Sequence, residues 1–206
     1  YRRLTAQGLE RVGDTLSAFE ATMQLAEDLE RSGRLGGMPS GYRDGLDQVG
    51  ENYLLQRDRW VSTRIAQLLK SVKPELRTQL MERIGQRLRG LEVGTDLDSL
   101  QRLMRIYGGH PDAQAKTLAG LRRLWNNGQI DLGADLLWRQ LARSADHGTA
   151  GEAIWRLAAS SAPAKTPAAA AFWYGRLLSD WKNETCVPRP DQPAQNGEQA
   201  VAALPD

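Results

Sequence analysis

Cysteine, histidine and long apolar runs are all scarce in this sequence. Its 206 residues contain one cysteine, Cys186, and two histidines, His110 and His147. A single cysteine excludes an internal disulfide, and so few thiol and imidazole groups argue against a zinc or similar metal site. No apolar stretch reaches the roughly 20 residues that an α-helix needs to cross a bilayer. We therefore expect no disulfide, no metal and no membrane span within this segment.

The sequence also lacks the patterns on which nucleotide binding and catalysis often depend. Neither GxGxxG nor GxxxxGK[ST], the patterns of phosphate-binding loops, occurs in it. His110 precedes Pro111 at an expected helix start, and His147 lies in the turn sequence ADHG. Neither histidine has a local serine or cysteine partner of the kind that nucleophilic catalysis requires. We expect a protein that is not an enzyme and that holds no cofactor.

Charge of one sign is not concentrated anywhere in the chain. The sequence has 27 Lys and Arg against 25 Asp and Glu, a net charge of +2. Arginines are interleaved with acidic residues, as on a solvated helix face, which argues against nucleic acid as a partner. A hydrophobic share of 41% and a charged share of 25% are ordinary for a globular protein. The composition therefore argues against nucleic acid, and the partner we expect is a protein or peptide, or neighbouring domains of the same chain.

Apolar residues recur at helical spacing along most of the chain. Gly13 suits the left-handed residue that ends one helix, and Asp14 can cap the next. Thr149 and Glu152 have the spacing of a capping box. The spacing predicts helices over residues 1–12 and 15–31, from Val61 to Val72, from Pro74 to Leu91, after Thr95, from Pro111, over 131–144, around Ile154, and a last one from Pro167 to Trp181. No sustained period-two pattern indicates a strand, so the expected fold class is all-α.

Changes in composition divide the chain into four expected segments. Residues 1–32 form an N-terminal helical hairpin, and 33–55, rich in glycine, form a loop or linker. Residues 56–182 form a helical-repeat domain, and the Pro-rich stretch 183–206 forms a flexible tail or linker. The opening YRRLTAQ has neither Met nor a signal peptide, so we interpret the chain as a piece of a longer polypeptide.

A two-helix pattern recurs in residues 1–29, 113–142 and 149–181. Large apolar residues precede each turn, and a small residue with apolar neighbours follows it, so that paired helices can approach closely. The period is close to the ~34 residues of stacked helical hairpins. These segments resemble divergent tetratricopeptide-type repeats, which implies helical hairpins stacked as an α-solenoid. An irregular all-α bundle is the alternative.

A second resemblance lies in three stretches, RDRWVSTRIAQLL (57–69), LMRIYGGHPDAQ (103–114) and LLSDWKNETC (177–186), together with the tail AVAALPD. They resemble the helical region that accompanies PQQ-type β-propeller repeats in large secreted bacterial proteins, planctomycete-like ones especially. This resemblance implies an extracytoplasmic setting, periplasmic or at the cell envelope. The implied role is a scaffold for protein–protein interaction within a larger protein, or a spacer that orients adjacent propeller domains without a separate partner.

The sharpest candidate for an interaction surface is the cluster Arg57, Arg59, Trp60 and Arg64. Trp and Arg are the residue types most often found at interaction hot spots. In the competing interpretation, Trp60 packs in the core and Asp58 pairs with an arginine one helical turn away. Trp60 adjoins the apolar stripe of its helix, so we favour the core position for its ring.

Overall fold

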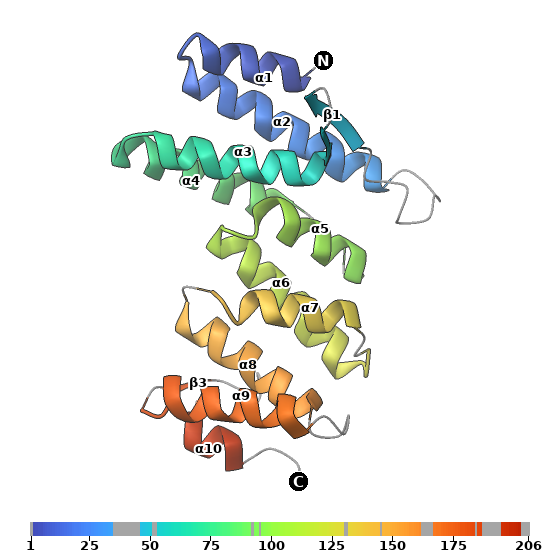
Figure 1. Ribbon diagram of the computed structural model, residues 1–206, viewed down its shortest axis with the longest axis vertical. Coiled ribbons are helices and arrows are strands. Elements are labelled where there is room, and N and C mark those ends of the chain that lie inside the picture. Colours follow the sequence, from blue (N-terminus) through green and yellow to red (C-terminus); the bar gives the residue numbers. More distant parts are fainter. Residues whose placement is uncertain are drawn as a thin grey trace. The chain divides into compact units, whose positions relative to one another are not determined.

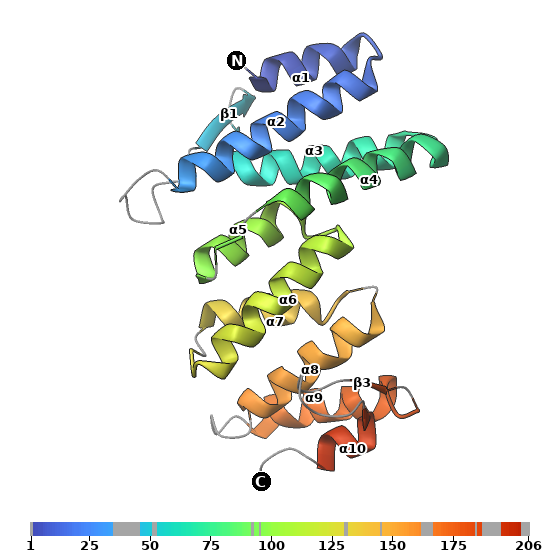
Figure 2. The same cartoon turned by 180° about the vertical axis from the view of Figure 1, so that it is seen from behind.

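The computed structural model describes residues 2–34, 46–50, 53–91, 93–94, 96–129, 132–144, 146–161, 167–183, 185–186 and 195–202. In this part of the chain the fold is all-α, with helices α1–α10 and two short antiparallel strand pairs (Figures 1 and 2). The helices confirm the expected fold class. The contacts divide the chain into two compact units, Tyr1–Ala113 and Gln114–Asp206, which are described separately below. This division falls within the segment 56–182 that the sequence analysis treats as one domain.

The first unit begins with a helical hairpin, α1 (Arg2–Arg11) and α2 (Thr15–Arg34). Gly13 has a φ of 82°, the left-handed conformation that glycine adopts without a steric penalty. The Asp14 carboxylate accepts a hydrogen bond of 3.0 Å from the backbone N–H of Ser17, so Asp14 caps α2. Both features confirm the turn that the sequence predicts.

Part of the expected linker 33–55 is β-structure. Strand β1 (Leu46–Gly50) pairs antiparallel with β2 (Tyr53–Gln56), and the register shifts between Gln48 and Gly50. The expected loop or linker therefore contains a strand pair over these residues. Tyr and Leu favour a strand where a partner strand lies close in sequence, and the run is too short to show a periodic pattern. Residues 35–45 lie outside the described part of the chain.

Helices α3 (Arg57–Ser71), α4 (Pro74–Gly90) and α5 (Leu97–Tyr107) complete most of the first unit. Pro74 occupies the first turn of α4, as predicted, because a missing N–H costs nothing there. Asp96 caps α5 by accepting a 2.9 Å hydrogen bond from the Ser99 N–H. Helix α3 contacts α2, α4 and α5. The residues of the expected N-terminal hairpin therefore share one compact unit with the helices that follow the loop.

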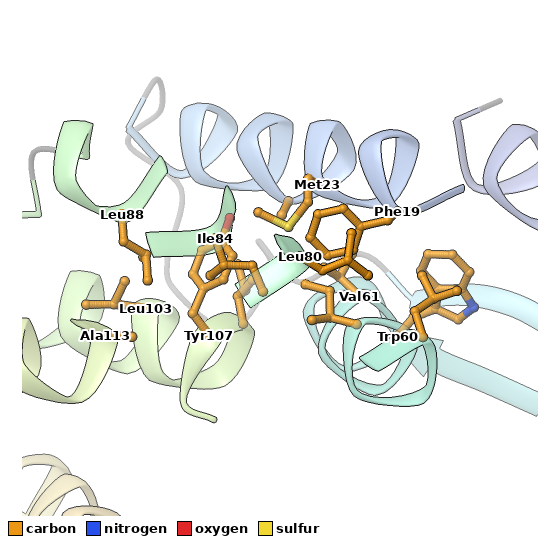
Figure 3. Packing of buried hydrophobic residues seen from close by; sticks show 14 of the residues in the cluster. Phe19, Met23, Trp60, Val61, Leu80, Ile84, Leu88, Leu103, Tyr107 and Ala113 are labelled. Carbon is orange, nitrogen blue, oxygen red and sulfur yellow. The ribbon is translucent and has the colours of Figure 1, made fainter. Parts of the chain in front are cut away.

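The core of the first unit is built from apolar side chains of α2, α3, α4 and α5 (Figure 3). Trp60 lies among them with 7% of its surface exposed, beside the fully buried Val61. The core position favoured for Trp60 is thus confirmed. The other labelled members of the cluster are Phe19, Met23, Leu80, Ile84, Leu88, Leu103, Tyr107 and Ala113.

The second unit contains most of α6 (Pro111–Asn126), followed by α7 (Leu132–Leu141), α8 (His147–Ser161) and α9 (Pro167–Asp180). Gly128, with a φ of 72°, lies just beyond the end of α6. Helix α8 contacts both α7 and α9, and its residues from Thr149 to Ala159 are buried without interruption. It is therefore the central helix of this unit.

The predicted capping box of Thr149 and Glu152 is wrong. Asp146 caps α8 instead, because its carboxylate accepts a 2.8 Å hydrogen bond from the backbone N–H of Thr149. Hydrogen bonds from Thr149 also lower the pKa of Asp146. Thr149 is therefore already inside the helix, and the Glu152 carboxylate is directed to arginine side chains described below.

The expected flexible tail 183–206 is wrong for the residues that the structure describes. Strand β3 (Thr185–Cys186) pairs with β4 (Gln195–Asn196), and α10 (Gly197–Ala202) follows as a helix beyond the expected last one. Asn196 and Gln199 cap α10 reciprocally, each side chain accepting from the other's backbone N–H at 3.0 and 3.2 Å. Helix α10 contacts α9. Prolines before residue 194 oppose helix formation, but they do not reach this helix. Residues 187–194 and 203–206 lie outside the described part.

We expect Trp60→Ala to lower the free energy of unfolding by about 3–5 kcal/mol, because it removes a large buried ring and leaves a cavity. Urea denaturation followed by circular dichroism measures the change. Arg59→Ala is the matched control, since the neighbouring side chain is exposed, and it should change stability by less than about 0.5 kcal/mol. An unchanged midpoint for Trp60→Ala would contradict the core position.

Deleting residues 184–206 should lower the melting temperature by more than about 5 °C, on the order of 1 kcal/mol or more for a unit of this size. The physical reason is that α10 buries Ala200 and contacts α9. Differential scanning calorimetry of the full and shortened chains tests this. A shortened chain that melts at the temperature of the full chain would show that the docking of α10 contributes no stability.

Candidate functional site

The structure does not bring the predicted surface residues together as an exposed aromatic patch. Trp60 lies in the core, and Asp58, which is also buried, pairs with Arg105 of α5 at 3.1 Å instead of with an arginine one turn away. Arg64 pairs with the carboxylate of Glu10 in α1. Arg59 is exposed, and the side chain of Arg57 lies outside the described part. The predicted surface is therefore wrong in its aromatic residue, because the apolar stripe of α3 carries Trp60 inward.

An open groove of about 500 Å³ lies between α7 and α9 in the second unit. Its walls combine guanidinium groups with aromatic rings, a mixture found in many recognition sites. Helix α7 and the turn after it provide Arg139, Ala142 and Arg143, and α9 provides Ala169, Phe172, Trp173 and Arg176.

The helical spacing of α7 and α9 explains why these residues face the groove. In α7, the positions that include Leu137 and Trp138 are buried, whereas Leu136 and Arg139 lie on the outer face. In α9, the buried row is Ala170, Trp173 and Leu177, and its neighbours Phe172 and Arg176 are displaced toward solvent. Of these outer residues, Arg139, Phe172 and Arg176 line the groove.

Two of the three groove arginines are held in place by acidic residues one helical turn away. The Arg139 Nε donates to Asp135 at 2.7 Å, and its guanidinium lies 5.6 Å from the centre of the Trp173 ring. Arg176 donates to Asp180 at 2.8 and 2.9 Å. Hydrogen bonds from Ser179 and Arg176 lower the pKa of Asp180, so its carboxylate stays ionised. These pairs orient the two guanidinium groups along the groove.

Arg143 differs from the other two groove arginines. Its side chain is exposed, and no carboxylate in the described ranges pairs with its guanidinium. A planar guanidinium presents donors that match a carboxylate in a two-point geometry. Arg143 is therefore the group in this groove best able to bind an anionic side chain.

Phe172 gives the groove an exposed apolar surface. The ring is 58% exposed and contacts Trp173 edge to face, with ring centres 4.8 Å apart. Leu136 on α7 is also largely exposed, one turn before Arg139. Apolar surface beside oriented cations suits a ligand that carries both an acidic group and an apolar side chain.

A buried cluster of charged side chains links α6 to α8. Arg156 of α8 is fully buried, with its Nη2 3.4 Å from the Glu152 carboxylate. Arg122 of α6 donates to the same carboxylate through Nε at 2.9 Å and through Nη2. This hydrogen bonding raises the pKa of Arg122, which therefore stays charged. The cluster ties α6 to α8.

Three tryptophans enclose the Arg156 guanidinium. The centres of the Trp125, Trp138 and Trp155 rings lie 4.8, 5.9 and 5.4 Å from it. Since Trp125 belongs to α6 and Trp138 to α7, this arrangement fixes both helices around α8 through cation–π contacts. The i, i+4 spacing of Glu152 and Arg156 was the one local signal for the cluster.

His110 forms hydrogen bonds with backbone groups on both of its ring nitrogens. His110 donates from Nε2 to the Met81 carbonyl oxygen at 3.0 Å, and its Nδ1 accepts from the Asp112 N–H at the start of α6. These contacts agree with its expected place at a helix start. Within the described ranges, no group of three His, Cys, Asp or Glu side chains is placed to hold a metal ion. None of the helices in these ranges combines the length and apolarity required to cross a membrane.

Comparisons with known proteins give no match to a family model, to a curated protein or to a solved structure. The function proposed below therefore depends on the geometry of the groove and on the resemblances described from the sequence.

Removing the carboxylate of Glu152 should destabilise the second unit strongly, because Arg156 would remain buried without this counter-charge. We expect Glu152→Ala to lower the free energy of unfolding by about 3–5 kcal/mol, measured by urea denaturation. Asp135→Ala is a matched control, since it breaks an exposed i, i+4 pair with Arg139 and should cost about 1 kcal/mol or less. Equal losses in the two variants would contradict a special role of the buried cluster.

Proposed function

We propose that this protein is a non-catalytic helical scaffold that binds an acidic, partly apolar segment of a partner protein in the groove between α7 and α9. The observation that carries the proposal is the combination, in one groove, of the exposed Phe172 with Arg143, whose guanidinium pairs with no carboxylate among the described residues. The guanidinium binds a carboxylate of the partner, and the Phe172 ring contacts an adjacent apolar side chain. Arg139 and Arg176 border the bound segment with groups already oriented by their own acidic partners.

The groove suits a peptide better than a nucleic acid. Asp135 and Asp180 lie beside the groove arginines and repel a phosphate backbone. Single-stranded nucleic acids bind on several exposed aromatic rings within a basic channel. Here Trp173 is buried, which leaves Phe172 as the exposed aromatic ring of the groove lining. The chain's net charge of +2 also gives little general attraction for polyanions.

The scaffold proposal includes an arrangement of the helices as a tetratricopeptide-like α-solenoid. Its support is that successive helices contact one another within each unit, α1 with α2, α2 with α3, α7 with α8 and α8 with α9. The resemblance to propeller-associated helical regions supports a setting within a larger extracytoplasmic bacterial protein.

A second candidate function is a spacer that orients adjacent propeller domains. Exposed apolar side chains on the first hairpin favour it, since Leu4 and Val12 are 63% and 78% exposed and a neighbouring domain could cover them. Leu4→Ser combined with Val12→Ser would then weaken contacts between domains of the parent protein, whereas the groove variants below would not.

A panel of fluorescent 15-residue peptides tests the groove. The peptides combine Glu-rich or Lys-rich sequences with or without a Leu or Phe. We expect the acidic–apolar peptides to bind most tightly, and we expect Arg143→Ala and Phe172→Ala each to weaken that binding about tenfold, measured by fluorescence anisotropy. Both side chains are exposed, so the melting temperature should stay within about 2 °C of the original.

Arg123→Ala is the control for the loss of one positive charge, because this exposed arginine of α6 does not line the groove. Its peptide affinity should match that of the original protein. Peptides whose binding ignores Arg143 and Phe172 would contradict the proposal. Oligonucleotides that bind more tightly than the peptides and lose affinity in the same two variants would instead indicate a nucleic-acid site.

A further inference from the structure

The segment Gln195–Ala202, here called the clamp segment, docks on α8 and on the end of α9. The Gly197 N–H donates to the Trp181 carbonyl oxygen at 2.8 Å. The Trp155 Nε1–H of α8 donates to the Ala200 carbonyl oxygen at 3.0 Å, and Ala200 is fully buried. An isolated helix of this length would not be stable in water. The clamp segment is therefore helical because it is docked.

Docking depends on glycine at position 197. A Cβ atom built there would lie 2.0 Å from the Leu177 carbonyl oxygen and 3.0 Å from that of Trp181. Both atoms belong to the backbone, so a side chain at 197 cannot be accommodated by a change of rotamer. A side chain at position 197 would therefore displace the clamp segment from α9.

Trp181 connects the docked segment to the groove. Its carbonyl oxygen accepts from Gly197, and its ring centre lies 5.9 Å from the guanidinium of Arg176, which lines the groove. Its Nε1–H donates to the His147 carbonyl oxygen at the start of α8, at 3.1 Å. Leu177, whose carbonyl faces Gly197, directly follows Arg176 in α9. Seating of the clamp segment therefore fixes the turn of α9 that holds Arg176 in position.

We propose that the clamp segment regulates the groove: the seated segment holds Arg176 in its binding position, and its release lowers the affinity of the groove for acidic ligands. The ligand in this statement rests on the proposed function. The change in the groove itself does not, because it concerns the position of α9 in the free protein.

The test uses 5-fluorotryptophan labelling and ¹⁹F NMR of the full chain without ligand. Trp155 and Trp181 report on the clamp segment, and Trp173 reports on the groove; single Trp→Phe variants assign the resonances. We expect Gly197→Ala to shift all three resonances and to weaken binding of the acidic–apolar peptide by about fivefold or more. Glu198→Ala, which changes an exposed side chain of the same segment, should leave all of these unchanged.

A second variant separates docking from general loss of folding. A chain that ends at residue 194 should show the same Trp173 shift, and adding a synthetic peptide of residues 195–206 should reverse it. Circular dichroism verifies that both variants remain helical.

The outcomes distinguish this proposal from the proposed function. A Trp173 resonance that stays in place while those of Trp155 and Trp181 move would overturn the regulation, as would unchanged peptide affinity in Gly197→Ala. A Trp173 shift that the added peptide reverses, in a protein that binds no acidic peptide, would support coupling of the clamp segment to α9 and contradict the proposed function.

Discussion

The second unit depends on one buried charge. Arg156 connects α8 to Trp125 of α6 and Trp138 of α7, so a displaced guanidinium would lose its contacts with both helices. Glu152 and the surrounding rings compensate the cost of burying its charge. A buried cation is costly to desolvate, so this arrangement penalises any packing in which the three helices are out of register. The position of the groove residues on α7 depends on the same cluster, because Trp138 on the buried face of this helix contacts Arg156.

Local signals in the sequence predict most of the helices correctly. Gly13 and Asp14 specify a turn between two helices, and Pro74 and Gly128 mark a start and an end that the structure reproduces. The core position of Trp60 also follows from its place beside the stripe of α3. In each case the decisive interaction lies within about four residues along the chain, which is the range that spacing and propensity describe.

The features that sequence analysis missed depend on contacts between distant residues. Spacing alone could not decide whether Glu152 caps α8 or neutralises Arg122, 30 residues earlier in the chain. The Asn196 and Gln199 capping pair is a local signal for a helix. The Pro-rich composition before it, however, predicts a flexible tail. Arg143 and Phe172 line the same groove because α8 packs against both α7 and α9. No motif in either helix marks these residues in advance.

The uninterrupted burial of Thr149–Ala159 in α8 has a consequence for biosynthesis. Its apolar surface is covered by α7 on one side and by α9 and β3 on others, and the last two follow it in the chain. A ribosome adding roughly 5–20 residues per second therefore releases α8 some seconds before its final neighbours emerge. During that interval the nascent chain exposes the apolar, aggregation-prone surface of α8, which includes Trp155. Translation speed and chaperone access thus bear more heavily on this helix than on any exposed one in the same unit.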